Sequence, residues 1–302
     1  MQMKKSLQSE KSSAILIALT SLLTLSSILL SSLPAQSWLP ADYPSRMARE
    51  HAADNPSPAA IALQSPQGSV ISNSISYATV NGEKINGFLS QPEAEAAKLP
   101  GIIVIHEWWG LNKNIRSITR QLAGLGYIAL AVDLYGGSVA KKPNEAVELM
   151  RSVQGDEKRG QDNIRQAYNF LAEELGCPRV GVIGWCFGGG WSLQTALILP
   201  GKIDAAVIYY GRLVTDPAIL KSLSMPILGI FGAEDRGIPV EMVREFESAL
   251  TSLGKPAEIH IYDGANHAFA NPSGRNYNAE AAEDAWQKTV QFFKMNLKAE
   301  RK

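Results

Sequence analysis

The feature that most constrains the fold of this chain is a series of uninterrupted apolar segments, separated by stretches with helical periodicity. Four of them, GIIVIHE, YIALAVDL, RVGVIGW and PILGIFG, occupy 101–107, 127–134, 179–185 and 226–232. A strand without polar alternation is buried on both faces, as in a parallel sheet. Further strand candidates are AAVIYYG (205–211) and AEIHIYD (257–263). The alternation predicts a doubly wound α/β fold, with a mostly parallel sheet and helices on both faces.

An antiparallel hairpin is expected to open the sheet. The segments ISYATV (75–80) and INGFLS (85–90) alternate in polarity and flank Asn81-Gly82, a dipeptide suited to a two-residue turn. Apolar periodicity predicts helices at 114–125, 143–153, 157–175, 189–199, 239–253 and 279–297. One α/β domain is therefore expected over 75–298, with two helices in the long connection 135–178.

The first 37 residues have the pattern of an export segment. Three lysines in the first 11 residues precede an uncharged run over 12–41, whose core at 14–30 is rich in Leu, Ile and Ala. Small residues at 35–37 offer a cleavage site, so a signal peptide is predicted, with an uncleaved membrane anchor as the alternative. The rest of the chain is expected to be exported, periplasmic or secreted, or anchored through this segment alone. Residues 38–74, rich in Pro, Ser and Ala, are predicted to form an extended linker or arm, with one or two short helical turns as an alternative over 45–53.

Composition excludes several classes of protein. The 29 Lys and Arg residues balance 29 Asp and Glu residues, whereas nucleic-acid binders normally carry a basic excess. Apolar residues make up 45% of the chain, which is enough for a packed core and argues against disorder. Two cysteines are too few for a disulfide framework.

The most informative motif is Gly184-Trp185-Cys186-Phe187-Gly188-Gly189, which lies between a predicted strand and a predicted helix. It matches the tight strand–turn–helix element that presents a catalytic nucleophile, with Cys in place of Ser. The two outer glycines are needed because side chains there would collide across the turn. The helix dipole favours a Cys186 thiolate, and the backbone N–H of Phe187 is a candidate oxyanion donor. A buried structural cysteine is the alternative interpretation.

The remaining catalytic residues are sought after the nucleophile, because this fold uses the chain order nucleophile, acid, histidine. His267 lies in a loop after the last predicted strand and is the predicted base. Asp235, in the loop after 226–232, is preferred over Asp263 as the acid that orients the base. His51 is placed in the linker and His260 inside a strand, so neither is expected to act.

One carboxylate stands out near the start of the domain. Glu107 follows a buried strand and precedes Trp108 and Trp109, at the sheet edge where ligands bind in open α/β folds. A carboxylate in a surface salt bridge is the alternative. The nearby tryptophans suggest an apolar, partly dry pocket, although large aromatic residues more often simply pack.

Five segments resemble, in the correct order, motifs of the dienelactone hydrolase (carboxymethylenebutenolidase) family of α/β-hydrolases. They are HEWWGLN (106–112), ALAVDLYGG (129–137), GWCFGGG (184–190), FGAEDRGIP (231–239) and GANHAFANP (264–272). The resemblance implies an eight-stranded hydrolase sheet, no metal and no cofactor. It also implies a triad of Cys186, Asp235 and His267. Glu107 resembles a switch carboxylate that holds or accepts the thiol proton, and the Trp108 backbone N–H resembles a second oxyanion donor beside that of Phe187.

The resemblance predicts a carboxylic ester hydrolase that cleaves a small lactone or ester through an acyl-thioester. Trp109, Phe269 and Asn271 are candidate pocket residues. Asn271 stands where the family pattern has a substrate-binding Arg, and 140–150 offers no counterpart of a second one, which favours a neutral or weakly charged substrate. Alternatives are a broad-specificity esterase or thioesterase of the same fold, a thiol-redox or amidotransferase-like protein, and a non-catalytic scaffold.

Overall fold

The computed structural model describes residues 42–52, 54, 65–94 and 98–298. The predicted export segment at 1–37 and part of the predicted linker lie outside these residues. The described chain contains an eight-stranded sheet with the strand order β1-β2-β4-β3-β5-β6-β7-β8. Strands β1, β2 and β4 pair antiparallel, and the pairs from β4 through β3 to β8 are parallel. The prediction of a doubly wound, mostly parallel α/β sheet is confirmed.

The opening hairpin consists of β1 (Val70–Val80) and β2 (Glu83–Pro92). Asn81 and Gly82 join them with φ angles of 52° and 79°, a left-handed pair that suits a tight hairpin turn. The structure confirms the predicted hairpin, but β1 begins before the expected residue 75.

Five strands form the buried centre of the sheet: β3 (Gly101–Ile105), β4 (Ile128–Val132), β5 (Val180–Trp185), β6 (Ala205–Tyr209) and β7 (Ile227–Gly232). Nearly every residue in them is buried, as their uninterrupted apolar sequences predict. The edge strand β8 (Ala257–Tyr262) is more exposed and alternates in polarity.

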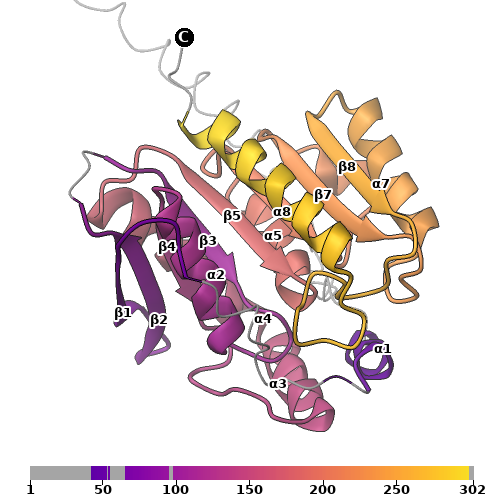
Figure 1. Cartoon of the computed structure of the whole chain (residues 1–302), viewed down its shortest axis with the longest axis horizontal. Helices are drawn as coiled ribbons and strands as arrows, with labels where there is room; N and C mark the ends of the chain where they lie inside the picture. The colour runs from indigo at the N-terminus through magenta and orange to yellow at the C-terminus, as the bar shows by residue number, and fades with distance from the viewer. Residues whose placement is uncertain (1–41, 53, 55–64, 95–97, 299–302) are drawn as a thin grey trace, which may run out of the picture. The chain divides into compact units, whose positions relative to one another are not determined.

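Helices cover both faces of this sheet, and Figure 1 shows α8 in front of the strands and α5 behind them. The predicted helices correspond to α2 (Lys113–Gly124), α3 (Pro143–Gly155), α4 (Glu157–Asn169), α5 (Phe187–Ile198), α7 (Val240–Ser252) and α8 (Ala279–Phe293). Helix α4 continues into a π-helical turn at Phe170–Glu174, and α8 continues into another at Lys294–Lys298. The short helix α6 (Pro217–Leu220) has no counterpart among the predicted helices.

The described part of the predicted linker contains a helix where the sequence predicts an extended arm, or at most one or two helical turns over 45–53. Residues Tyr43–Glu50 form helix α1, whose Tyr43 and Met47 are one turn apart on the same helix face and are fully buried. Helix α1 packs near α3. The polar composition of this stretch is misleading, because two well-placed apolar residues are enough to bury a short amphipathic helix.

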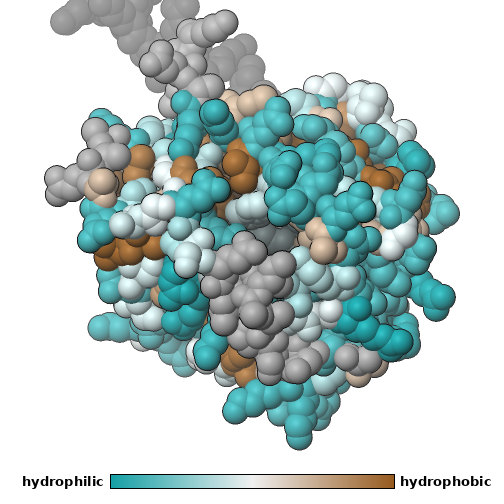
Figure 2. Space-filling view, in the orientation of Figure 1, coloured by the Kyte–Doolittle hydropathy of each residue, from teal (hydrophilic) through white to brown (hydrophobic). Residues whose placement is uncertain are grey.

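Apolar side chains are concentrated between the sheet and its helices. The face shown in Figure 2 is mostly hydrophilic, with apolar residues in small separate groups. Within the described ranges, no helix combines the length and the apolar character that crossing a membrane requires.

The carboxyl ends of four strands bring the predicted catalytic residues to one edge of the sheet. Glu107 follows β3, Cys186 follows β5, Asp235 follows β7 and His267 follows β8. These strands are close in the order β3-β5-β6-β7-β8 and run in parallel, so the loops that follow them converge.

At this edge the first turn of α5 lies so close to the end of β3 that there is no space for a side chain at Gly188. A Cβ there would lie 2.4 Å from the carbonyl oxygens of Ile105 and His106. We therefore expect Gly188→Ala to lower the free energy of unfolding of the folded protein by about 3 kcal/mol, or to prevent folding. A Cβ on Gly155, at the end of α3, would meet no atom within 4 Å, so Gly155→Ala is the matched control and should be neutral or slightly stabilising. Denaturant unfolding of both variants tests this, and equal stability would contradict it.

Candidate active site

Cys186 lies at the turn between β5 and α5, in a backbone conformation that residues other than glycine seldom adopt. Its φ and ψ are 52° and −115°. The turn is fixed by close backbone packing, since a Cβ on Gly184 would lie 2.0 Å from the Gly188 carbonyl oxygen. Strain of this kind is typical of functional sites, and it places the thiol at the N-terminus of α5.

His267 and Asp235 form a buried pair beside this thiol. Nδ1 of His267 lies 2.7 Å from Oδ2 of Asp235, and both side chains are fully buried. The other carboxylate oxygen accepts hydrogen bonds from the backbone N–H groups of Gly237 and Ile238, at 2.7 and 2.8 Å. The carboxylate is therefore held rigidly and fixes the ring so that Nε2 remains for chemistry. Asp263, the rejected alternative, is exposed.

The Nε2 atom of His267 has no hydrogen-bond partner within the described structure. Burial alone would lower the pKa of His267, but the charges of Asp235 and Cys186 hold that pKa well above its ordinary value. An imidazole with one nitrogen anchored and one unpartnered is arranged for proton transfer.

The Glu107 side chain is buried, and its carboxyl group is hydrogen-bonded to Asn271. The Asn271 side-chain amide donates a 2.8 Å hydrogen bond to Oε2 of Glu107, while Oε1 has no partner in the described residues. The pKa of Glu107 is raised to about 8, mainly by burial and secondly by the charge of the nearby Cys186 thiolate. The carboxyl group is therefore mostly protonated at neutral pH, with its proton expected on the unpartnered oxygen.

The aromatic residues near the thiol are buried. Trp108, Trp109, Phe187 and Phe269 are all at most 1% exposed. The rings of Trp108 and Trp109 contact each other at a centroid distance of 4.7 Å. Phe187 is the first residue of α5, where helix geometry leaves the backbone N–H without an intrahelical acceptor. The oxyanion roles of the Phe187 and Trp108 amides stay predictions.

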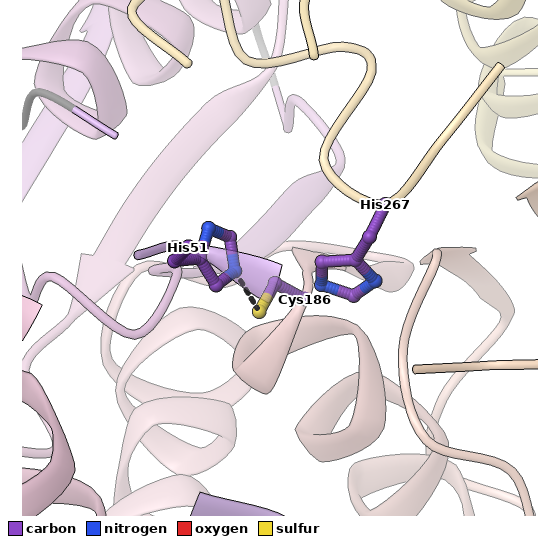
Figure 3. A group of neighbouring side chains, drawn as sticks. All are labelled: His51, Cys186 and His267. Atoms are coloured by element: carbon purple, nitrogen blue, oxygen red, sulfur yellow. Dashed lines mark hydrogen bonds between the residues drawn. The ribbon is translucent and has the colours of Figure 1, made fainter. Parts of the chain in front are cut away.

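The segment that follows α1 brings an unexpected residue to the site. His51 is 1% exposed, and its Nε2 lies 3.5 Å from Sγ of Cys186. Figure 3 shows the thiol between the rings of His51 and His267, whose centroids are 5.1 Å apart. The sequence interpretation of His51 as an uninvolved linker residue missed this contact. The one local signal was Asp54, three residues later, at a spacing that allows a hydrogen bond.

These surroundings favour the ionised form of the Cys186 thiol. Burial alone would raise the pKa of Cys186, but the positive charges of His267 and His51, together with the hydrogen bond to His51, lower it to about 6. Cys177 provides the contrast, because burial raises the pKa of its thiol to about 12. Both cysteines are free. Cys186 is thus the cysteine equipped for nucleophilic chemistry.

The same atoms could also hold a metal ion. One nitrogen from each of His51 and His267 and the Cys186 sulfur lie within 4.8 Å of one another. Each imidazole is backed by a carboxylate, as is common for zinc ligands. The same arrangement also suits a catalytic thiol, because two imidazoles beside it can take its proton and stabilise the thiolate.

The other two histidines lie outside this chemistry. His106 donates from Nδ1 to the Glu107 carbonyl and accepts at Nε2 from the Leu134 N–H, and burial lowers its pKa. Both of its ring nitrogens therefore have structural partners. His260 on β8 pairs with Glu258 at the surface.

Comparison with known proteins identifies the family to which the chain is similar. Residues 85–297 match the model of the dienelactone hydrolase family. A presumed carboxymethylenebutenolidase from Saccharolobus solfataricus is 33% identical over 252 residues, covering 71% of this chain and 95% of that protein. One from Escherichia coli K12 is 30% identical, covering 77% and 90%.

Solved structures agree with the sequence comparisons. The crystal structure of a presumed dienelactone hydrolase from Klebsiella pneumoniae is similar to this chain with a TM-score of 0.67 and 29% identity. The similarity covers 75% of this chain and 99% of that one. With its α/β-hydrolase sheet and the matched span of 85–297, the chain belongs to the dienelactone hydrolase family.

Proposed function

We propose that this chain hydrolyses a lactone or ester with Cys186 as the nucleophile, through an acyl-thioester. The observation that carries the proposal is the strained turn that presents Cys186 beside His267, whose ring is held by Asp235 at 2.7 Å. Nucleophile, orienting acid and base follow three strands of one sheet, and this is the chain order that α/β-hydrolases use.

The reaction divides into two balanced steps. In the first, the Cys186 thiolate forms a bond to the carbonyl carbon, and the carbon–oxygen bond of the leaving group breaks. The protonated Nε2 of His267 gives its proton to that oxygen. In the second, neutral His267 takes a proton from water, the new oxygen–carbon bond forms, and the carbon–sulfur bond breaks. The acid product leaves, and the thiolate and imidazolium are restored.

The developing oxyanion needs donors that do not have to reorganise. We assign this role to the backbone N–H groups of Phe187, at the start of α5, and of Trp108, directly after Glu107. The Phe187 amide also benefits from the helix dipole.

Glu107 acts in this proposal as a neutral neighbour of the thiolate. An ionised carboxylate there would repel the thiolate, whereas the protonated form can donate a hydrogen bond toward it. The contact from Asn271 to Oε2 orients the group so that Oε1 carries the proton. Ionisation of Glu107 therefore disfavours the Cys186 thiolate, and protonation of Glu107 favours it.

A broad-specificity esterase of the same fold is the second candidate, and the position of Asn271 favours it. The Asn271 amide is engaged by Glu107 and cannot supply the charge of the arginine found there in the family pattern. A ligand carboxylate buried without a cation would lose more in desolvation than it gains. We therefore expect a neutral aryl acetate to show a higher kcat/KM than a carboxylated dienelactone.

The direct test of the proposed function replaces the nucleophile. We expect Cys186→Ser to lose at least about 100-fold in kcat/KM on the better of these two substrates, because the serine hydroxyl is far harder to ionise than the thiol. Cys177→Ser is the matched control and should retain activity. Comparable losses in both variants, or full activity in Cys186→Ser, would contradict the assignment.

The choice of acid is tested by a second matched pair. Asp235→Asn should reduce kcat by about 100-fold or more, because it removes the charge that holds the His267 imidazolium and its tautomer. Asp263→Asn changes an exposed side chain and should leave kcat within about twofold. Steady-state kinetics on the same ester compare the two, and the opposite order would show that Asp263 is the acid.

The two shifted ionisations predict a bell-shaped pH dependence. As the pH falls through about 6, the pKa of Cys186, its thiolate is protonated and kcat/KM decreases. As the pH rises through about 8, the pKa of Glu107, that carboxyl group ionises, its charge opposes the thiolate, and kcat/KM decreases again. In Glu107→Gln the upper limb should move to higher pH while the lower limb remains. An upper limb that is unchanged in Glu107→Gln would assign that ionisation to another group.

A further inference from the structure

The segment after α1 brings a second imidazole, that of His51, to the Cys186 thiol. Like the imidazole of His267, it is hydrogen-bonded to a carboxylate. Nδ1 of His51 lies 2.6 Å from Oδ2 of Asp54, and these side chains are 1% and 4% exposed. This leaves Nε2 of His51 directed at Sγ of Cys186, at 3.5 Å. The arrangement is the same as that of His267 and Asp235, but it comes from the opposite end of the chain.

The position of His51 is fixed by more than this hydrogen bond. Its ring stacks on Trp108 with a centroid distance of 4.5 Å and an interplanar angle of 25°. The second oxygen of Asp54 accepts from the backbone N–H of Arg275 at 3.2 Å. Packing alone would explain a buried histidine, but it would not require a carboxylate on one nitrogen and a thiol on the other.

The same segment is tied to the loops that carry the triad. The guanidinium of Arg46, on α1, donates to the Gly237 carbonyl at 2.5 Å, two residues after Asp235. Arg275, which contacts Asp54, follows His267 in the loop before α8. Met47 also reaches the thiol, with its sulfur 3.8 Å from Sγ. The segment that carries His51 is therefore held against the catalytic loops on both sides of that residue.

We propose that His51, oriented by Asp54, is a second catalytic imidazole that takes the Cys186 proton and remains the ionic partner of the thiolate. His267 is then left to serve the leaving group and the water. The inference rests on the proposed function, since it assumes that Cys186 is the nucleophile.

The proton balance is consistent with this division. The thiol proton moves from Sγ to Nε2 of His51 and stays there through the cycle. The His267 proton goes to the leaving group and is replaced from water, so each turnover consumes one ester and one water. Burial would lower the pKa of His51, but its hydrogen bonds to Asp54 and Cys186 raise it to about 9, so it keeps this proton at neutral pH.

Other ionisable groups also face the thiol and must be separated from His51 in a test. They are His267 with Asp235, Glu107, and the tyrosine hydroxyls of residues 43, 135 and 210. The tyrosines have raised pKa values, with burial as the main cause and nearby negative charge as a further one, so they stay neutral below pH 10. The pKa of Cys177 is about 12, so its thiol stays protonated in this range. Because the His51 and Asp54 variants leave every tyrosine and Cys177 in place, the difference in ultraviolet thiolate absorbance between each variant and the unsubstituted protein between pH 4 and 9 reports Cys186.

The first experiment titrates this absorbance in the intact chain. In His51→Gln, which keeps a hydrogen-bonding group and removes the charge, the Cys186 pKa should rise by about one pH unit or more. Asp54→Asn should shift it in the same direction by a smaller amount. His260→Gln is the matched control, because His260 lies at the surface on β8, and should leave the titration unchanged.

The second experiment separates acylation from deacylation with an aryl acetate. At pH 5.5, below the thiolate pKa, His51→Gln should slow single-turnover release of the aryl alcohol about tenfold, the factor that a one-unit pKa change implies. Its rate of acyl-enzyme hydrolysis at pH 7 should fall by less than its acylation rate, because water, and not the Cys186 thiolate, is the nucleophile in that step. In His267→Gln the acyl-enzyme hydrolysis should instead fall by about 100-fold or more.

The outcomes separate the role of His51 from the proposed hydrolysis through Cys186. An unchanged thiolate titration in both His51→Gln and Asp54→Asn would overturn the role of His51 and leave the Cys186 mechanism standing. Loss of deacylation without loss of acylation in His51→Gln would overturn the division of roles. If His51→Gln fails to fold, Asp54→Asn carries the test, since a role limited to packing predicts no pKa change in that variant.

Discussion

The close crossing of β5 and α5 fixes everything else in the site. Gly184 lets the end of β5 approach α5, and Gly188 lets α5 approach the end of β3, both at distances that exclude a Cβ. Cys186, between the two glycines, has a φ of 52°. This turn sets the position of the thiol at the carboxyl edge of the sheet and at a helix N-terminus. The loops after β3, β7 and β8 then need only reach the same edge to bring Glu107, Asp235 and His267 to the thiol.

Burial of this centre makes its charges interdependent. Removing a thiolate from water costs several kcal/mol unless opposite charge compensates, and one counter-charge at about 4 Å offers roughly 4 kcal/mol at an effective dielectric of about 20. The imidazole of His51, the second one beside Cys186, stabilises the thiolate further through the same electrostatic attraction. Protonation of Glu107 removes a negative charge that would oppose the thiolate. The same closeness explains why the Cys186 pKa is lowered although the side chain is fully buried.

The sequence was sufficient for features set by local pattern. Apolar strands, the Asn81-Gly82 turn and the glycines around Cys186 have consequences that follow from neighbouring residues, and the structure agrees with each. His51 could not be predicted in this way, because its contact with Cys186 joins residues 135 positions apart. The hydrogen bond between Asn271 and Glu107 shows the same limit, because it joins residues 164 positions apart. The place of Asn271 in the substrate pocket stays a prediction. Polar pairs across the chain depend on three-dimensional packing and leave little trace in periodicity or composition.

The central claim is that acyl groups pass through Cys186 within this arrangement. The most direct measurement is rapid quenching of the protein during turnover of an aryl acetate, followed by peptide mass spectrometry to locate the acetyl group. We expect the acetyl group on the peptide that contains Cys186, with Cys177 unmodified. An acetyl group found reproducibly on another residue, or turnover without any adduct under conditions in which deacylation is slowed in His267→Gln, would contradict the account.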